Sequence, residues 1–163
     1  DLGVFVNAHN IVELAGEPAW EARLADLAAL PKTAPETGLT AWLCARAVES
    51  GIRRHAGVVT DLYTPTGKRQ IVKGKDLSAV QWLVGTGGAL TRIPGGEAIL
   101  RSICKGPGKY LLPPPEVRIL IDRDYRFSAL GTLAQAYPQE VKATFRFWVQ
   151  SETGLRDEGF SQT

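Results

Sequence analysis

The stretch LVGTGGALTRIPGG, from Leu83 to Gly96, decides the fold of this chain, because it sets five glycines and one proline between an apolar run and a helical one. A strand that ends in Gly-Thr-Gly-Gly brings its backbone close to whatever lies beyond it, since glycine has no Cβ. In open α/β sheets, ligands bind outside the carboxyl ends of the strands. The stretch therefore predicts a strand, a tight turn and a helix, with a ligand beside the turn as one possibility.

The glycine pattern alone does not identify that ligand. It lacks the GxxxxGK[ST] of a phosphate-binding loop and the GxGxxG with a distant acidic residue that marks dinucleotide sites. GTGGAL supplies only GxGG. A nucleotide site and a purely structural turn both remain open on this pattern.

The regions on either side of the turn alternate between strand and helix signals. Short β-prone runs predict strands at 2–8 and 78–84, a hairpin at 58–74 closed by the turn TPTG, and a strand at 117–122. Helical spacing of apolar residues predicts helices at 18–30, 39–57, 95–103, 124–137 and 138–150. This order predicts an α/β fold, a mixed sheet covered by helices, in one domain over residues 1–150 with a polar tail at 151–163.

Composition excludes several classes of protein. The chain has 163 residues, 44% of them apolar, and 19 basic against 17 acidic side chains, so it has no strong field to attract nucleic acid or anionic lipid. No apolar run approaches the roughly 20 residues that cross a bilayer, and no signal peptide is visible. Cys44 and Cys104 lack metal-site spacing and resemble small apolar residues, although a disulfide between them stays open. We expect a cytoplasmic protein without a membrane or nucleic-acid partner.

The chain contains no methionine and begins at Asp1 within a β-prone run. We therefore expect it to be a piece of a longer protein. The basic residues of the predicted hairpin, Lys68, Arg69, Lys73 and Lys75, should face solvent and protect a strand edge, in preference to binding nucleic acid.

Two segments resemble the C-terminal lobe of the actin-like ATPase superfamily, which has a ribonuclease-H-like fold. They are Val80 to Pro94, which matches the superfamily's adenosine motif, and Asp124 to Gln135, which is similar to its last-lobe helix with small residues for close packing. The resemblance implies that five consecutive residues bind the adenosine of ATP or ADP: Gly85, Thr86, Gly87, Gly88 and Ala89. Arg92 is a further candidate for this site because of the chemistry of its guanidinium.

A more extensive resemblance covers most of the chain. DLGVFVNA at the start, RRHAG at 53–57, GKDLSAV at 74–80, VGTGGAL at 84–90 and the long run from Leu111 to Pro138 are similar to the C-terminal portion of the MutL/GlmL family. This family accompanies cobalamin-dependent glutamate mutase and related aminomutases, and is distinct from the mismatch-repair protein of the same name. The resemblance implies an ATP-driven chaperone that releases damaged cobalamin, with Mg²⁺ as cofactor in the intact protein. Its partners would be a mutase subunit and an N-terminal lobe that this chain lacks.

The remaining polar residues give weaker indications. Thr86 and Thr91 could offer hydroxyls to a nucleotide, and Arg92 could stack on adenine, contact a phosphate or simply be solvated. Asp122 and Asp124 could act as an acid-base pair, but a helix-capping role for one of them is the preferred interpretation.

No metal site and no catalytic residue can be assigned. His9 and His55 have no partner at metal-ligand spacing, and both are interpreted as surface or helix-end residues. Asp1-Leu2-Gly3 and the run VTDLYTPTG echo phosphate-binding hairpins of the superfamily, yet both are interpreted as structural. The aromatic residues Phe145, Phe147 and Trp148 are expected in the core, with docking onto an absent lobe as the alternative.

Three hypotheses on function remain. The first is a nucleotide-binding lobe that does not hydrolyse ATP by itself. The second is a non-enzymatic module that docks on a mutase subunit. The third is a lobe of a small-molecule kinase of the same superfamily.

Overall fold

A computed structural model describes residues 2–106 and 108–153 of the chain. The N-terminal part consists of helix α1 (Ala8–Ala15), the 3₁₀ helix η1 (Pro18–Asp26) and the long helix α2 (Ala34–His55). After α2 come the strands β1 (Val58–Thr64) and β2 (Gly67–Lys73), then β3 (Trp82–Gly85), and the short helices α3 (Gly88–Arg92) and α4 (Gly96–Ser102). Strand β4 (Arg118–Ile121) and helices α5 (Arg126–Leu133) and α6 (Pro138–Thr153) complete the fold.

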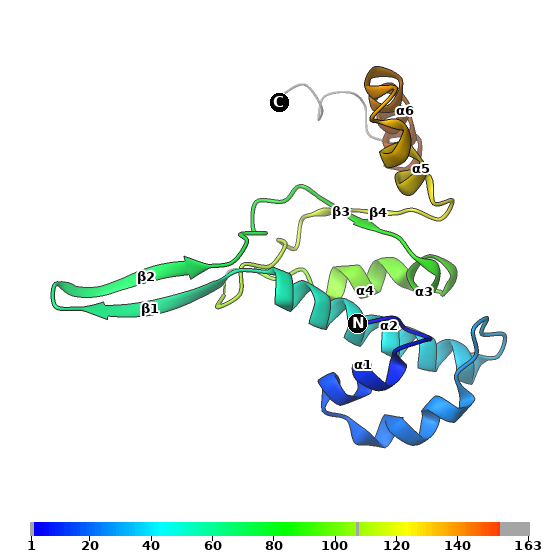
Figure 1. Cartoon of the computed structure of the whole chain (residues 1–163), viewed down its shortest axis with the longest axis horizontal. Coiled ribbons are helices and arrows are strands. Elements are labelled where there is room, and N and C mark those ends of the chain that lie inside the picture. The colour runs from blue at the N-terminus through cyan, green and yellow to red at the C-terminus, as the bar shows by residue number, and fades with distance from the viewer. Residues whose placement is uncertain (1, 107, 154–163) are drawn as a thin grey trace.

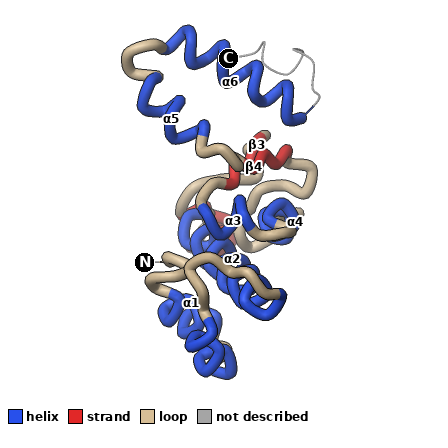
Figure 2. The backbone as a smooth tube through the Cα atoms, turned by 90° about the vertical axis from the view of Figure 1, so that its right-hand side faces the viewer, coloured by secondary structure: helices blue, strands red, loops and turns tan. Residues whose placement is uncertain are grey.

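Strands β3 and β4 form a parallel pair at the centre of the molecule, with Trp82 opposite Arg118 and Gly85 opposite Ile121. Their side chains alternate between two faces, as in any strand. Leu83 and Ile119 pack towards α2 and α4, whereas Leu120 packs against Trp148 and Val149 of α6. The parallel pair is therefore covered by helices on both faces, which is usual for parallel strands (Figures 1 and 2).

The predicted single mixed sheet is wrong, although the α/β class is confirmed. The chain forms two separate two-stranded sheets, the antiparallel hairpin β1–β2 and the parallel pair β3–β4. Hairpin and body are linked by isolated bridges from Ala56 to Lys75 and from Val58 to Tyr110. Most hairpin side chains are exposed, so no buried surface holds the hairpin against the central pair, and it projects away from the body (Figure 1).

The strand predicted at residues 2–8 is also wrong. Residues 4–7 form a turn in which the Asn7 N–H donates to the carbonyl oxygen of Gly3, and α1 begins at Ala8. Ile11 and Val12 of α1 are buried against Leu39 and Leu43 of α2. Helical packing on α2 buries these apolar residues, and no neighbouring strand pairs with the segment in the part of the chain that the structure describes.

The other predicted elements are confirmed with shifted boundaries. The helix predicted at 18–30 is a 3₁₀ helix that ends at Asp26, and its Trp20 stacks on Trp42 with ring centroids 4.2 Å apart. The helix predicted at 138–150 continues to Thr153, and the rest of the predicted tail lies outside the described residues. Among the described residues, no helix has the length and apolar character needed to span a membrane.

Candidate functional site

The predicted glycine turn follows β3, but it leads into the short helix α3, and the helix predicted at 95–103 is α4. Gly87 has φ of 96°, a backbone conformation that side chains of L-residues rarely adopt, and its carbonyl oxygen accepts hydrogen bonds from the Leu90 and Thr91 N–H groups. A Cβ added at Gly87 would meet no atom within 4 Å. Glycine is needed here for the backbone angle, and the space beside it is open.

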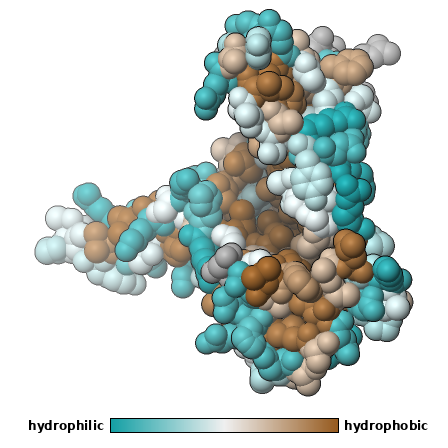
Figure 3. All heavy atoms as spheres, turned by 45° about the vertical axis from the view of Figure 1, so that its right-hand side comes forward, coloured by the Kyte–Doolittle hydropathy of each residue, from teal (hydrophilic) through white to brown (hydrophobic). Residues whose placement is uncertain are grey.

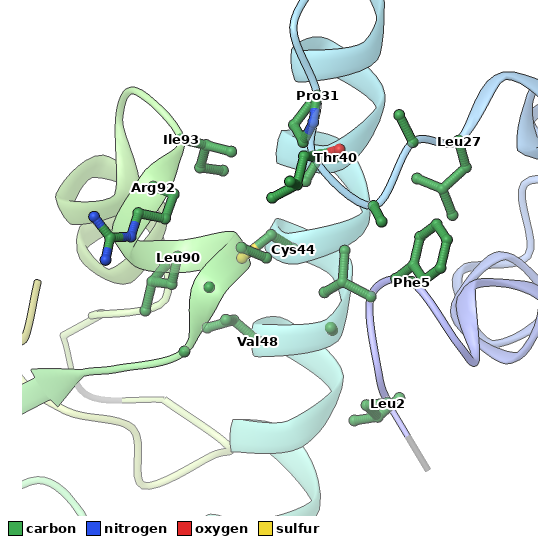
Figure 4. Close-up of a pocket in the computed structure, with 18 of the residues that line it drawn as sticks. Leu2, Phe5, Leu27, Pro31, Thr40, Cys44, Val48, Leu90, Arg92 and Ile93 are labelled. Atoms are coloured by element: carbon green, nitrogen blue, oxygen red, sulfur yellow. The ribbon is translucent and has the colours of Figure 1, made fainter. Parts of the chain in front are cut away.

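That space belongs to a cavity of about 730 Å³ (Figure 4). One wall is the turn with α3, formed by residues 86–90 together with Arg92 and Ile93. A second wall is one side of α2, where Thr40, Cys44, Ala47 and Val48 recur at helical spacing. The N-terminal segment with Leu2, Val4 and Phe5, together with residues 27–31, forms the remaining side of the cavity, which is partly open to solvent.

Five of the six predicted adenosine-site residues line this cavity: Thr86, Gly87, Gly88, Ala89 and Arg92. Gly85 does not. A Cβ on Gly85 would lie 2.6 Å from both Leu100 Cδ1 and Leu90 Cδ2, and 3.0 Å from Ile121 Cδ1. A side chain at Gly85 would therefore require the buried side chains of Leu90 and Leu100 to shift.

The predicted threonine hydroxyls differ in position. Thr86 is exposed and lines the cavity, whereas Thr91 is 2% exposed and does not. Within the described residues, the Oγ1 atoms of Thr91 and Thr40 have no hydrogen-bond partner and are shielded from solvent. Thr40 thus contributes to the wall without presenting its oxygen to the cavity.

The cavity is mainly apolar, and Arg92 is the charged residue among those that line it in the described part of the chain. The Arg92 guanidinium carbon lies 6.0 Å from the centre of the Tyr125 ring, close enough for a weak cation–π interaction. Burial raises the pKa of the Cys44 thiol to about 11, so this side chain is neutral at physiological pH. Such a site suits a flat apolar group with one anionic or π-rich end.

Sequence reasoning missed Tyr125 and the wall formed by α2. Tyr125 has φ of 56° and lines the cavity where α5 begins, a conformation that the sequence does not reveal. The Thr40, Cys44 and Val48 spacing was visible as a stripe of small residues. The sequence does not show what this stripe faces, because its neighbours across the cavity lie about 40 positions away along the chain.

The two candidate acid-base residues are not a catalytic pair. Asp122 is fully buried, and its carboxylate accepts hydrogen bonds from the Arg126 and Phe127 N–H groups at 2.8 and 3.0 Å. This confirms the predicted capping role, at the N-terminus of α5. Asp124 is exposed and pairs with Arg126 at 2.8 Å.

The histidines, the cysteines and two of the three aromatic residues lie where the sequence analysis placed them. His9 Nδ1 lies 2.6 Å from Glu21 Oε1 on the surface, and His55 ends α2. Cys44 and Cys104 are buried and unbridged. Trp148 is buried and Phe145 packs beside it, but Phe147 is 73% exposed, so for Phe147 the predicted core position is wrong.

Comparisons with known proteins identify relatives of this chain. A family model described as MutL protein matches residues 1–148. Protein MutL of Clostridium tetanomorphum is 31% identical over 113 residues, which are 69% of this chain and 24% of the relative. The chain thus spans about a quarter of the length of this curated relative. No solved structure matches it.

Proposed function

Because the chain belongs to the MutL family, we propose that it forms the nucleotide-binding lobe of an ATP-dependent factor that reactivates a cobalamin-dependent mutase. In this function the factor uses ATP to release damaged cobalamin from a mutase subunit. The observation that carries the proposal is the cavity beside Gly87 and Gly88, whose backbone borders the open space without side chains.

The cavity fits the adenosine part of a nucleotide. Its apolar walls on α2 and α3 suit the faces of a purine ring, and the bare turn allows close approach to the backbone. Arg92 and Tyr125 border the same space, and a guanidinium can stack on a purine or bind a phosphate oxygen. We assign Thr86, Gly87, Gly88, Ala89 and Arg92 to this site.

The cavity does not fit magnesium and a triphosphate. Arg92 is the one cation among its described lining residues. Across residues 2–106 and 108–153, no group of three His, Cys, Asp or Glu side chains could hold a metal ion. Phosphoryl transfer needs metal ions and several positioned charges, so under this proposal they come from parts of the protein outside this chain.

The test is binding of ATP to a Gly87→Val variant, measured by isothermal titration calorimetry. The added side chain enters the cavity and distorts a backbone with φ of 96°, so binding should be lost while the far-UV circular dichroism is unchanged. Gly95→Val is the matched control, because Gly95 has φ of 82° and open space around it but does not line the cavity. Binding retained in Gly87→Val, or lost equally in Gly95→Val, would contradict the assignment.

The non-enzymatic docking module remains the second candidate, and the exposed hairpin favours it. Calorimetry of the wild-type chain with ATP and with a mutase subunit separates the two. Binding of the subunit without binding of ATP would favour the docking module. A kinase lobe would be indicated by phosphorylation of added sugars or acids in the complete protein.

A further inference from the structure

The hairpin β1–β2 stands in solvent. All seven residues of β2 are exposed, and among the described residues β1 has one further strand contact at its base, the isolated bridge from Val58 to Tyr110 (Figure 1). A two-stranded hairpin is marginally stable by itself in water, and apolar side chains on it gain nothing from exposure. Figure 3 shows hydrophobic side chains between hydrophilic ones along this projecting arm.

The pairing register divides the hairpin into two faces. Leu62 lies opposite Arg69, and Thr60 opposite Ile71, so these side chains share one face with Lys73. We call Thr60, Leu62, Arg69, Ile71 and Lys73 the basic face. Leu62 and Ile71 form its apolar centre and are 45% and 43% exposed.

The two faces differ in how their charges are balanced. On the opposite face, Lys68 Nζ lies 2.8 Å from Asp61 Oδ2, and Gln70 donates a hydrogen bond to Asp61 Oδ1. The basic face has no acidic residue, and the described part of the chain supplies no ion pair to Arg69 or Lys73. Its two cations therefore remain uncompensated beside two exposed aliphatic side chains.

We propose that the basic face is a docking surface for a protein that presents carboxylates around an apolar patch. Carboxylates would pair with Arg69 and Lys73 while Leu62 and Ile71 are covered. This partner is the mutase subunit, an assignment that rests on the proposed function. A nucleic acid fits less well, because an apolar centre offers nothing to a phosphate backbone and the whole chain carries a formal charge of only +2.

The test measures binding of purified glutamate mutase subunits to the wild-type chain and to Arg69→Glu/Lys73→Glu, by surface plasmon resonance at two salt concentrations. The double variant should bind about tenfold more weakly or worse, and the wild-type affinity should fall as salt rises. Lys105→Glu/Lys142→Glu is the matched control, with the same charge change at exposed residues outside the hairpin. Circular dichroism verifies that the fold is retained, and Leu62→Ser tests the apolar centre without changing charge.

Each outcome separates the inference from the proposed function. Weaker binding in the hairpin variants, with unchanged binding in the control, supports the inference. Equal binding by wild type and hairpin variants overturns the inference and leaves the proposed function standing. If the wild-type chain binds ATP but no mutase subunit, both the docking inference and the mutase part of the proposed function are wrong. If the wild-type chain binds a polyadenylate RNA and Arg69→Glu/Lys73→Glu does not, the basic face is a nucleic-acid site and the inference is wrong.

Discussion

Two glycines of the same turn are required for different reasons. Gly87 is needed for its positive φ and borders an open cavity. Gly85, two residues earlier, has ordinary strand geometry but is enclosed by Leu90, Leu100 and Ile121. Both glycines belong to the same sequence motif, but Gly87 lines a candidate binding site and Gly85 lies in the core.

Gly85→Ala is predicted to destabilise the chain by about 1–3 kcal/mol, the usual cost of overpacking a core. The added methyl group would overlap the side chains of Leu90 and Leu100 at 2.6 Å. Gly88→Ala is the control, since its Cβ would lie 3.6 Å from the Tyr125 hydroxyl, an ordinary contact. Urea unfolding measures both free energies. Equal stability of Gly85→Ala and wild type would show that the core around β3 accommodates an added methyl group, which would contradict the prediction.

At the scale of elements, α2 provides the frame on which the other parts assemble. Its 22 residues pack against α1, α3 and α4 and form one wall of the cavity. Its start is set by a capping box, in which Thr33 Oγ1 accepts from the Glu36 N–H and the Glu36 carboxylate accepts from the Thr33 N–H. These contacts connect residues within one turn, so the sequence around Thr33 is sufficient to begin the helix.

Acid should weaken this helix start through Glu36. Hydrogen bonds from the Lys32 and then the Thr33 backbone N–H lower the pKa of Glu36 from its ordinary value of 4.5. A lowered pKa in the folded state means that the stabilisation is complete above the unfolded value and is lost as pH falls through the folded one. The unfolding free energies of wild type and Glu36→Gln, compared at about pH 7 and about pH 3, should therefore converge in acid. A difference that does not change with pH would contradict this role of the charge.

At the scale of the whole molecule, the cavity exists because distant segments meet. The glycine turn, α2 and the N-terminal segment each contribute one wall, and the helices on both faces of β3–β4 hold the turn in place. The same assembly leaves the hairpin outside the body. The two proposed binding surfaces therefore lie in different parts of the molecule, a partly open apolar cavity in the body and an exposed basic arm.

The chain by itself should bind adenine nucleotide weakly and should not hydrolyse it. One arginine in the cavity cannot neutralise a triphosphate, and the described residues offer no metal-binding cluster. Phosphate release from ATP and Mg²⁺ measures this, with Gly87→Val as control. Hydrolysis that persists in Gly87→Val would come from a contaminant. Hydrolysis by wild type that disappears in the variant would overturn the expectation.

The sequence by itself determined the elements whose signals are local: the hairpin with its TPTG turn, α2 from Leu39 onward, the strand that ends at Gly85, and the glycine turn. It also indicated most residues of the turn wall and the capping role of an aspartate after β4. Tertiary structure decided the rest, because burial depends on what a segment meets. Residues 8–15 form a helix because their apolar side chains pack on α2. The hairpin is separate from the central strands because no apolar surface buries it against them. Tyr125 and Cys44 lie far from Gly87 in the sequence, and the folded chain brings all three to the same cavity.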